Sequence, residues 1–563
     1  MKNKGIIIML FFCFVITGIN YAQNKNKNHP NVLFIVVDDM NDWIHCLNNY
    51  PDAVTPNIDR LANMGMLFTN TMCASPLCGP SRAAVFTGKR PETTHVYHNI
   101  GDYTDYAPNE ISIPEYFKNA GYYSMGAGKV IHPTGNVVPE AFDEYGPGTG
   151  VVGTPFTDEE LLTVNMDPTV VIKRGKLQVT LPMNGISTLD RPSNRWSTFD
   201  WGPLDITDSV MPDGKIALWA INKLNNSYKT PFFLAAGFYK PHQPFFAPRK
   251  YFDMYNQQSV SLPPTIAGDL NDLPWIGQQF GLLPWTAGTH KTVTEYGQWK
   301  EGIRGYLAVI SFADAQVGKL LDALENSPYS DNTLIIFWSD HGWHLGEKEH
   351  WGKFTPWERS VHTSMIIVPP KKYQPKGFIP GTRCDALVSL LDIYPTLLEM
   401  CHLEPKTDLE GQSLLPLLMN PDTAWNFPQV TTIGIGNHSV RTKNWRYIKY
   451  FDGTEELYDH RSDPEEWFNL AGNPKYQNIK QRLSGYIPED KRVKQFVRWS
   501  KWKAVIMNDG SFLLFDILEP SGISDQHNVA DDNADVVRYI RTYLKEKNIH
   551  AKYVKITDFN NID

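Results

Sequence analysis

The sequence lacks an excess of basic residues: 53 Lys and Arg stand against 61 Asp and Glu, a formal net charge of −8. Proteins that bind nucleic acid need a positive surface, so this balance argues against a nucleic-acid partner. The composition, 42% hydrophobic and 20% charged, excludes a disordered or fibrous chain. At 563 residues the chain is long enough for one large domain and one smaller domain.

Long hydrophobic runs are also missing, except at the amino terminus. Residues 1–22 contain Lys2 and Lys4, then an apolar run from Gly5 to Ile19, then small or polar residues around Ala22. This pattern is typical of a cleaved signal peptide and is too short for a comfortable membrane span, although an uncleaved anchor is the alternative. We therefore expect an exported protein, periplasmic or secreted, that has no membrane contact after signal cleavage.

Cysteine is scarce, and five cysteines remain after the expected signal peptide. They are Cys46, Cys73, Cys78, Cys384 and Cys401. An odd number in an exported protein leaves at least one thiol unpaired or chemically altered. The sequence alone does not decide whether Cys384 pairs with Cys401 across the helix predicted between them.

Short apolar runs alternate with helical patterns along most of the chain. Residues 31–42, NVLFIVVDDMND, are rich in β-branched side chains and end in two acids, as expected of a strand buried on both faces of a parallel sheet. The pattern recurs at residues 333–341, and residues 212–224 and 305–324 have helical spacing. We predict an α/β fold with a large, mostly parallel sheet flanked by helices. Ligands bind at the carboxyl ends of such strands.

From near residue 431 the apolar runs become shorter and alternating, with tighter turns. We therefore assign residues 28–430 to the catalytic α/β domain and residues 431–563 to a smaller antiparallel subdomain. An internal repeat lies in the second part: residues 440–459 and 497–516 align without gaps at an offset of 57 residues. Asp-Gly between two strand-like runs predicts a hairpin in each copy. We expect the two hairpins to pack in a single sheet, as a duplicated scaffold without chemistry of its own.

Four clusters could carry chemistry: Asp38-Asp39, Cys78 to Arg82, Lys129 with His132, and Asp340-His341. Three carboxylates and an imidazole at one sheet edge predict a hard divalent cation such as Ca²⁺, because the acids would otherwise repel each other. Cys78 should lie just before a helix that ends at Gly88, where free N–H groups favour anions. From the residues alone it is either a thiolate nucleophile or a small buried side chain.

The segment CGPSRAAVFTGKRP resembles the signature of the type I sulfatases, Cys-x-Pro-x-Arg. Further segments match that family in order over nearly the whole mature chain: VLFIVVDD, GAGKVIHP, FYKPHQPF, FWSDHGWHLGE, HWGKF and LLDIYPTLLE. The resemblance implies an alkaline-phosphatase-like fold, hydrolysis of sulfate esters, and bound Ca²⁺. It also implies that a formylglycine-generating, sulfatase-maturating enzyme oxidises Cys78 to the aldehyde formylglycine. FYKPHQPFFAP and GKRPETTHVYHN are most similar to the iduronate-2-sulfatase-like branch, which implies a sulfated sugar or polysaccharide, such as a uronate sulfated at O2.

The resemblance also assigns roles to individual residues. It makes Asp38, Asp39, Asp340 and His341 metal ligands, together with modified Cys78. His341 stands where many sulfatases have Asn, although the Asp-His form also occurs in the family. Arg82 would hold the modified side chain, and the sulfate ester would be contacted by Lys129, His132, His242 and Lys353.

The implied mechanism starts from a hydrated aldehyde, of which one hydroxyl attacks sulfur. The second hydroxyl, deprotonated by a base, expels sulfate; we expect His132 to be that base. We expect His242, as a group of intermediate pKa, to protonate the leaving oxygen. Two alternatives stay open: a phosphonate or phosphodiester hydrolase on the same scaffold, and an inactive carbohydrate-binding relative. The intact Cys78 motif argues against the second alternative.

Overall fold

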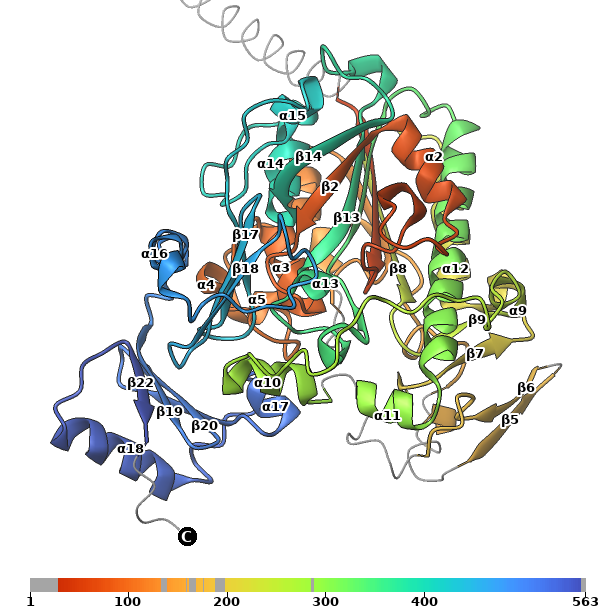
Figure 1. The fold of residues 1–563 in the computed structure, drawn as a ribbon. Helices are drawn as coiled ribbons and strands as arrows, with labels where there is room; N and C mark the ends of the chain where they lie inside the picture. The colour runs from red at the N-terminus through yellow and green to blue at the C-terminus, as the bar shows by residue number, and fades with distance from the viewer. Residues whose placement is uncertain are drawn as a thin grey trace, which may run out of the picture.

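The fold is that of a computed structural model, shown in Figure 1. It describes residues 29–132, 139–157, 159–161, 169–175, 177–187, 198–284 and 288–557. The expected signal peptide, residues 1–22, lies outside the described residues. Within them, no helix is both long and apolar enough to cross a membrane.

The centre of the larger unit is an eight-stranded sheet with the order β14-β2-β13-β10-β1-β8-β3-β4. Its strands are β1 (Asn31–Asp38), β2 (Met66–Met72), β3 (Tyr123–Gly128), β4 (Glu144–Tyr145), β8 (Phe232–Pro241), β10 (Thr333–Ser339), β13 (His362–Val368) and β14 (Thr382–Ser389). Only β13 runs antiparallel to its neighbours, so the prediction of a mostly parallel sheet is confirmed. The reversal follows from the connection: after β10 the chain stays at the carboxyl edge through residues 340–361, and β13 therefore starts there.

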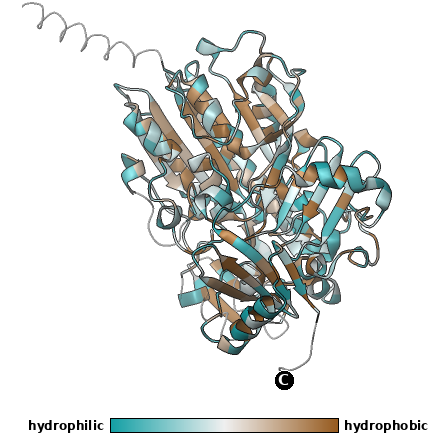
Figure 2. Ribbon diagram, turned by 90° about the vertical axis from the view of Figure 1, so that its left-hand side faces the viewer, coloured by the Kyte–Doolittle hydropathy of each residue, from teal (hydrophilic) through white to brown (hydrophobic). Residues whose placement is uncertain are grey.

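Helices cover both faces of this sheet because β1 is apolar on both sides. Its side chains alternate between two buried clusters, with Leu33 in one and Phe34 in the other. The helices of the first cluster are α2 (Pro56–Met64), α8 (Pro212–Leu224) and α12 (Trp299–Glu325). Those of the second are α3 (Cys78–Thr87), α6 (Ile113–Asn119) and α14 (Ile393–Met400). Figure 1 shows α12 and α14 on opposite sides of the sheet, and the sheet strands are largely brown in Figure 2.

The carboxyl-terminal part contains two four-stranded sheets. The first has the order β15-β16-β17-β18 and the second the order β21-β20-β19-β22. Their strands are β15 (Gln429–Thr432), β16 (His438–Arg441), β17 (Trp445–Lys449), β18 (Glu455–Asp459), β19 (Val493–Trp499), β20 (Trp502–Met507), β21 (Phe512–Asp516) and β22 (Tyr553–Ile556). The expectation of a single sheet is therefore wrong.

The two repeat copies nevertheless fold alike. Trp445 pairs with Asp459 in the first hairpin, and Trp502 pairs with Asp516 in the second, so both hairpins have the same register. The similarity extends beyond the hairpins: β16 and β19 each add a third strand, and helices α16 (Gln477–Ser484) and α18 (Ala534–Glu546) follow. Each sheet buries one face under its own helix. The other faces share one apolar cluster. The copies occupy separate sheets because β15 and β22 cover the free edges of β16 and β19.

A buried cation occupies the same position in both copies. Arg446 is paired with Arg441 across β16 and β17, and Lys503 is paired with Arg498 across β19 and β20. The Arg446 guanidinium contacts Glu358 of the larger unit, whereas the Lys503 ammonium donates to the carbonyl of Ile435, which lies just before the first copy (2.7 Å). Each copy is thus anchored to the part of the chain that precedes it.

Candidate active site

Most of the predicted site residues lie at or just after the carboxyl ends of four neighbouring strands, β10, β1, β8 and β3. Asp38 ends β1, and Asp39 adopts the left-handed conformation (φ 62°) that few residues other than glycine adopt. Two long-range hydrogen bonds hold it there: its N–H donates to Asp340 Oδ1 (3.0 Å), and its carbonyl accepts from the Tyr306 hydroxyl (2.7 Å). The backbone turn at Asp39 is therefore fixed from both β10 and α12.

Helix α3 presents Cys78 to this edge. The helix begins at Cys78 itself, one residue earlier than expected, and ends at Gly88, whose left-handed φ of 68° confirms the expected cap. The N-cap, Leu77, has no side-chain hydrogen bond to the helix; instead Asn99 Oδ1 accepts from the Gly79 N–H (2.8 Å). This bond lets the loop that contains Asn99 stabilise the start of the helix, where Cys78 is buried.

Arg82 lies one helical turn after Cys78 and is fully buried. Its guanidinium bridges two strands, with Nε 2.9 Å from Asp340 Oδ2 and a terminal nitrogen 3.1 Å from Asp38 Oδ1. It also donates to the carbonyls of Lys129 and Val130. Arg82 is therefore the central cation among the predicted ligands, and its hydrogen bond engages Oδ2 of Asp340.

Two lysines face the remaining carboxylate oxygens. Lys129 contacts Asp38, and its ammonium lies 4.8 Å from the centre of the Tyr239 ring. Lys353 Nζ lies 2.6 Å from Asp39 Oδ1 and 3.0 Å from Cys78 Sγ. Burial opposes the charged form, but the neighbouring anions raise the pKa of both lysines above its ordinary value. Both side chains therefore carry a positive charge beside Cys78.

The acids respond differently to this environment. Burial raises the pKa of Asp39 to about 8 despite Lys353. Burial acts in the same direction on Asp38, yet Lys129 and Arg82 hold the pKa of that carboxyl well below its usual range. For Cys78, burial and Asp38 oppose the thiolate, but Lys129 and Lys353 lower the pKa of the thiol.

Four of the predicted metal ligands come together: single ligand atoms of Asp38, Asp39, Cys78 and His341 lie within 4.8 Å of one another. Asp39 Oδ2 is buried and, among the described residues, has no hydrogen-bond partner. An unsatisfied buried carboxylate oxygen within such a group fits a divalent cation. Asp340 is not part of this group of four, because its oxygens accept from Arg82, from the Asp39 N–H and from its neighbour.

The two predicted catalytic histidines also lie at this edge. His242 Nδ1 is 2.5 Å from the Gln243 carbonyl, so Nδ1 carries the proton and Nε2 faces Asp39 Oδ2 at 3.6 Å. Burial, followed by Lys353 and Lys129, holds the pKa of His242 well below its ordinary value. The expectation of an intermediate pKa is therefore wrong for this structure, because the sequence does not show how deeply the ring is buried among lysines.

His132 follows β3 and resembles His242 electrostatically. Burial and Lys129 hold the pKa of His132 well below its ordinary value, so the imidazole is neutral. Within the described residues its Nδ1 is buried without a hydrogen-bond partner. A neutral ring with a free nitrogen can accept a proton.

Sequence reasoning missed several residues that shape the site. Tyr239 and Trp343 lie under the ammonium groups of Lys129 and Lys353, and both belong to matched segments that drew attention to other residues. No sequence pattern marked Tyr306 as a site residue, because its position on α12 is one that any residue of a buried helix face could occupy. All five described cysteines are free, so Cys384 and Cys401 do not pair in this structure.

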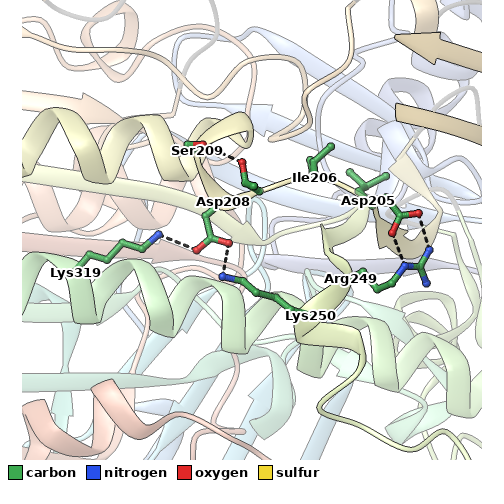
Figure 3. A pocket seen from close by; sticks show the side chains of 9 residues that line it. Asp205, Ile206, Asp208, Ser209, Arg249, Lys250 and Lys319 are labelled. Carbon is green, nitrogen blue, oxygen red and sulfur yellow. Dashed lines mark hydrogen bonds and ion pairs between the residues drawn. The ribbon is translucent and has the colours of Figure 1, made fainter. Parts of the chain in front are cut away.

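Two hollows lie elsewhere. The groove in Figure 3, about 650 Å³, is lined by paired charges: Lys250 and Lys319 both contact Asp208 at 2.8 Å. A polar cavity of about 420 Å³ is lined by residues of both the larger unit and the first repeat copy, Arg359 and Arg441 among them. Neither hollow contains Cys78 or the predicted metal ligands.

Comparisons with known proteins agree with this geometry. A family model described as Sulfatase matches residues 30–403, and one described as N-sulphoglucosamine sulphohydrolase, C-terminal, matches residues 346–493. The chain is 38% identical over 473 residues to a sulfatase of Formosa agariphila, covering 83% of this chain and 87% of that protein. It is 29% identical over 571 residues to human iduronate 2-sulfatase, covering 85% and 98%.

Solved structures show the same fold. The phosphonate monoester hydrolase of Agrobacterium radiobacter aligns with a TM-score of 0.64 at 21% identity, covering 81% of this chain and 94% of that chain. A structure described as a complex with D-glucosamine-2-N,6-O-disulfate aligns with a TM-score of 0.59 at 20% identity, covering 81% and 96%. With a family model that spans most of the larger unit, these matches show that the chain belongs to the sulfatase family and is a sulfuric ester hydrolase.

Proposed function

We propose that this sulfatase is exported, binds Ca²⁺, carries formylglycine at position 78, and removes the 2-O-sulfate of a uronate or a similar sugar within a polysaccharide. The observation that carries the proposal is the position of Cys78 Sγ, which lies 3.0 Å from the Lys353 ammonium and 3.3 Å from His341 Nε2. An oxygen nucleophile there would have a cation-binding group on one side and fixed positive charge on the other.

A metal ion and a modified residue 78 would complete this site. Ca²⁺ would be held by Asp38, Asp39, His341 and modified Cys78, with Asp340 beside them, and supplies positive charge that favours an ionised nucleophile. Formylglycine, made by a maturating enzyme, supplies a hydrate with one hydroxyl to attack sulfur and a second to release sulfate. Oxygen ligands predominate, which favours Ca²⁺ over softer metals.

The side chains of the chain itself bind and move protons. Lys129, Lys353 and Arg82 offset the negative charge of the ester and of its transition state. His132, neutral and with no hydrogen-bond partner for Nδ1 in the described part of the chain, accepts the proton of the second hydroxyl. The doubly protonated ring of His242 donates from Nε2 to the departing sugar oxygen; the negative ester beside it favours that charged form, whereas burial, Lys353 and Lys129 hold the pKa of His242 low in the ligand-free protein.

The substrate assignment relies on relatives. Human iduronate 2-sulfatase is 29% identical, and an ulvan-active sulfatase of Formosa agariphila is 24% identical over 493 residues. Both names support a sulfated carbohydrate. The apolar amino-terminal run supports export, where a polymer too large to cross a membrane is accessible.

The test is release of inorganic sulfate, measured by ion chromatography on protein coexpressed with a maturating enzyme. A panel of oligosaccharides sulfated at single positions should show the highest kcat/KM for 2-O-sulfated uronate. Cys78→Ala should abolish release and leave the fold intact, whereas Cys73→Ala, a matched buried cysteine outside the metal group, should keep it. Mass spectrometry should find the tryptic peptide of residue 78 converted from thiol to aldehyde, and an unchanged mass in active enzyme would rule the modification out.

A phosphonate monoester hydrolase is the second candidate, because two solved enzymes of that description share the fold with TM-scores of 0.64. Matched aryl sulfate, phosphate and phosphonate esters separate the two activities. We expect the highest kcat/KM for the sulfate. Turnover of the phosphonate without turnover of the sulfate would favour the second candidate.

A further inference from the structure

One buried lysine beside the site has no partner among the carboxylates that surround Cys78. Lys240 lies near the end of β8, two residues before His242, and its side chain is fully buried. Its ammonium donates to two main-chain carbonyls, those of His242 (3.1 Å) and Pro244 (2.5 Å). A buried polar group is tolerated when hydrogen bonds satisfy it, and here the loop that carries His242 supplies them.

The main chain at Lys240 is fixed from the opposite side by Asp213. This residue lies in the first turn of α8 and is buried. Its two oxygens accept from the backbone N–H groups of Tyr239 and Lys240, both at 2.9 Å. Asp213 therefore anchors the end of β8, and the ammonium of Lys240 anchors the loop that follows. Residues 239–244 are held at both ends by hydrogen bonds to buried side chains.

The side chain presented by this loop is the His242 imidazole. Its orientation depends on the hydrogen bond from Nδ1 to the Gln243 carbonyl (2.5 Å), which directs Nε2 toward Asp39. Gln243 lies between the two residues whose carbonyls accept from Lys240. A shift of this segment would therefore move Nε2 out of line, and misplacement by about 1 Å can lower a rate by about 10²-fold.

We propose that Lys240 is a positioning residue that aligns His242 Nε2 with the bridging oxygen of the sulfate ester. This rests on the function proposed above. When the bond between sulfur and the bridging oxygen breaks, the electron pair stays on the sugar oxygen, which takes the proton of His242. A sugar alkoxide is a poor leaving group and needs that proton, whereas 4-nitrophenolate leaves without it.

This difference between leaving groups provides the test. Lys240→Met keeps the length of the side chain and removes its donors. We expect kcat for a sulfated sugar to fall at least about tenfold and kcat for 4-nitrophenyl sulfate to fall less than about threefold. Lys240→Arg, whose guanidinium can donate to both carbonyls, should retain most of the activity on the sugar. Assays are made below the unfolding temperature of each variant.

Lys503→Met is the control, because Lys503 is a buried lysine of the carboxyl-terminal part, where it pairs with Asp525 and donates to the Ile435 carbonyl. It should change both turnover rates by the same factor. Equal losses on both substrates in Lys240→Met would overturn the positioning role, as would a Lys240→Arg variant no more active than Lys240→Met. Wild-type protein that releases no sulfate from either substrate would refute the proposed function itself, and the positioning role with it.

Discussion

Arg82 offers the sharpest test of how the site is built. The guanidinium is fully buried and bridges Asp38 and Asp340 from neighbouring strands, with further bonds to the carbonyls of Lys129 and Val130. Arg82→Met would leave both carboxylates without this partner. Removing one member of a buried ion pair costs about 3–5 kcal/mol, because an uncompensated charge remains inside the protein.

The expected shift in melting temperature follows from the size of the unit. Unfolding entropy is about 2.1 cal/mol/K per residue, or ~0.8 kcal/mol/K for a cooperative unit of about 400 residues. A loss of 3–5 kcal/mol then lowers Tm by about 4–6 °C, which differential scanning calorimetry resolves easily. Arg82→Lys should fall between the wild type and Arg82→Met, because one ammonium cannot bridge both carboxylates and reach the carbonyls.

The control is Arg461→Met, which breaks the ion pair of an exposed guanidinium with Asp459 and should leave Tm nearly unchanged. Calcium provides a second readout. Since Arg82→Met leaves more negative charge among the predicted ligands, added Ca²⁺ should recover more of the Tm in this variant than in the wild type. A Tm within 1 °C of wild type, unaffected by Ca²⁺, would refute the reasoning.

Three further predictions concern the metal, a buried acid and the repeat. Chelation should lower activity and Tm together, because Ca²⁺ at a thousandfold excess over Kd adds about 4 kcal/mol to the free energy of unfolding, and Asp39→Asn should lose this dependence; full activity after exhaustive chelation would contradict it. Burial raises the pKa of Glu92 to about 7, so its contribution to stability is complete below about pH 4.5 and is lost as the pH rises through 7. Melting curves should therefore show that the free energy of unfolding of Glu92→Gln, relative to the wild type, is higher at pH 8 than at pH 5 by on the order of 3 kcal/mol. An equal difference between variant and wild type at both pH values would count against this. Arg446→Met should lower the free energy of unfolding by about 3–5 kcal/mol in chemical denaturation, since it leaves Glu358 and Glu466 without their shared partner, and an unchanged midpoint would refute the anchoring role.

The parts of the fold that the sequence predicted are those encoded by short, contiguous patterns. The run from Asn31 to Asp38 is apolar on both faces, which only a strand buried between two helical layers can accommodate, and the structure confirms it. The end of α3 at Gly88 could also be predicted from a single position, because a left-handed cap strongly favours glycine. In each case a single segment contains all the information.

What the sequence could not show depends on contacts between distant residues. The reversal of β13 is set by the path of residues 340–361, and the separation of the repeat copies by β15 and β22, which lie outside the repeated segments. In the site, the matched motifs predicted which residues lie together, but they did not show that Arg82 pairs with Asp340. The low pKa of His242 likewise arises from burial beside Lys353, 111 positions away in the chain.

The balance of charge explains why cation and ester binding should depend on each other. Arg82, Lys129 and Lys353 provide three buried positive charges, and each contacts Asp38, Asp39 or Asp340, so their donors face the chain's own acids. A sulfate ester would therefore meet cations whose hydrogen bonds are already directed at these carboxyl groups. A divalent cation among these acids would free the lysines and the arginine to face the ester. This coupling is the reason that chelation should reduce turnover and stability together rather than stability alone.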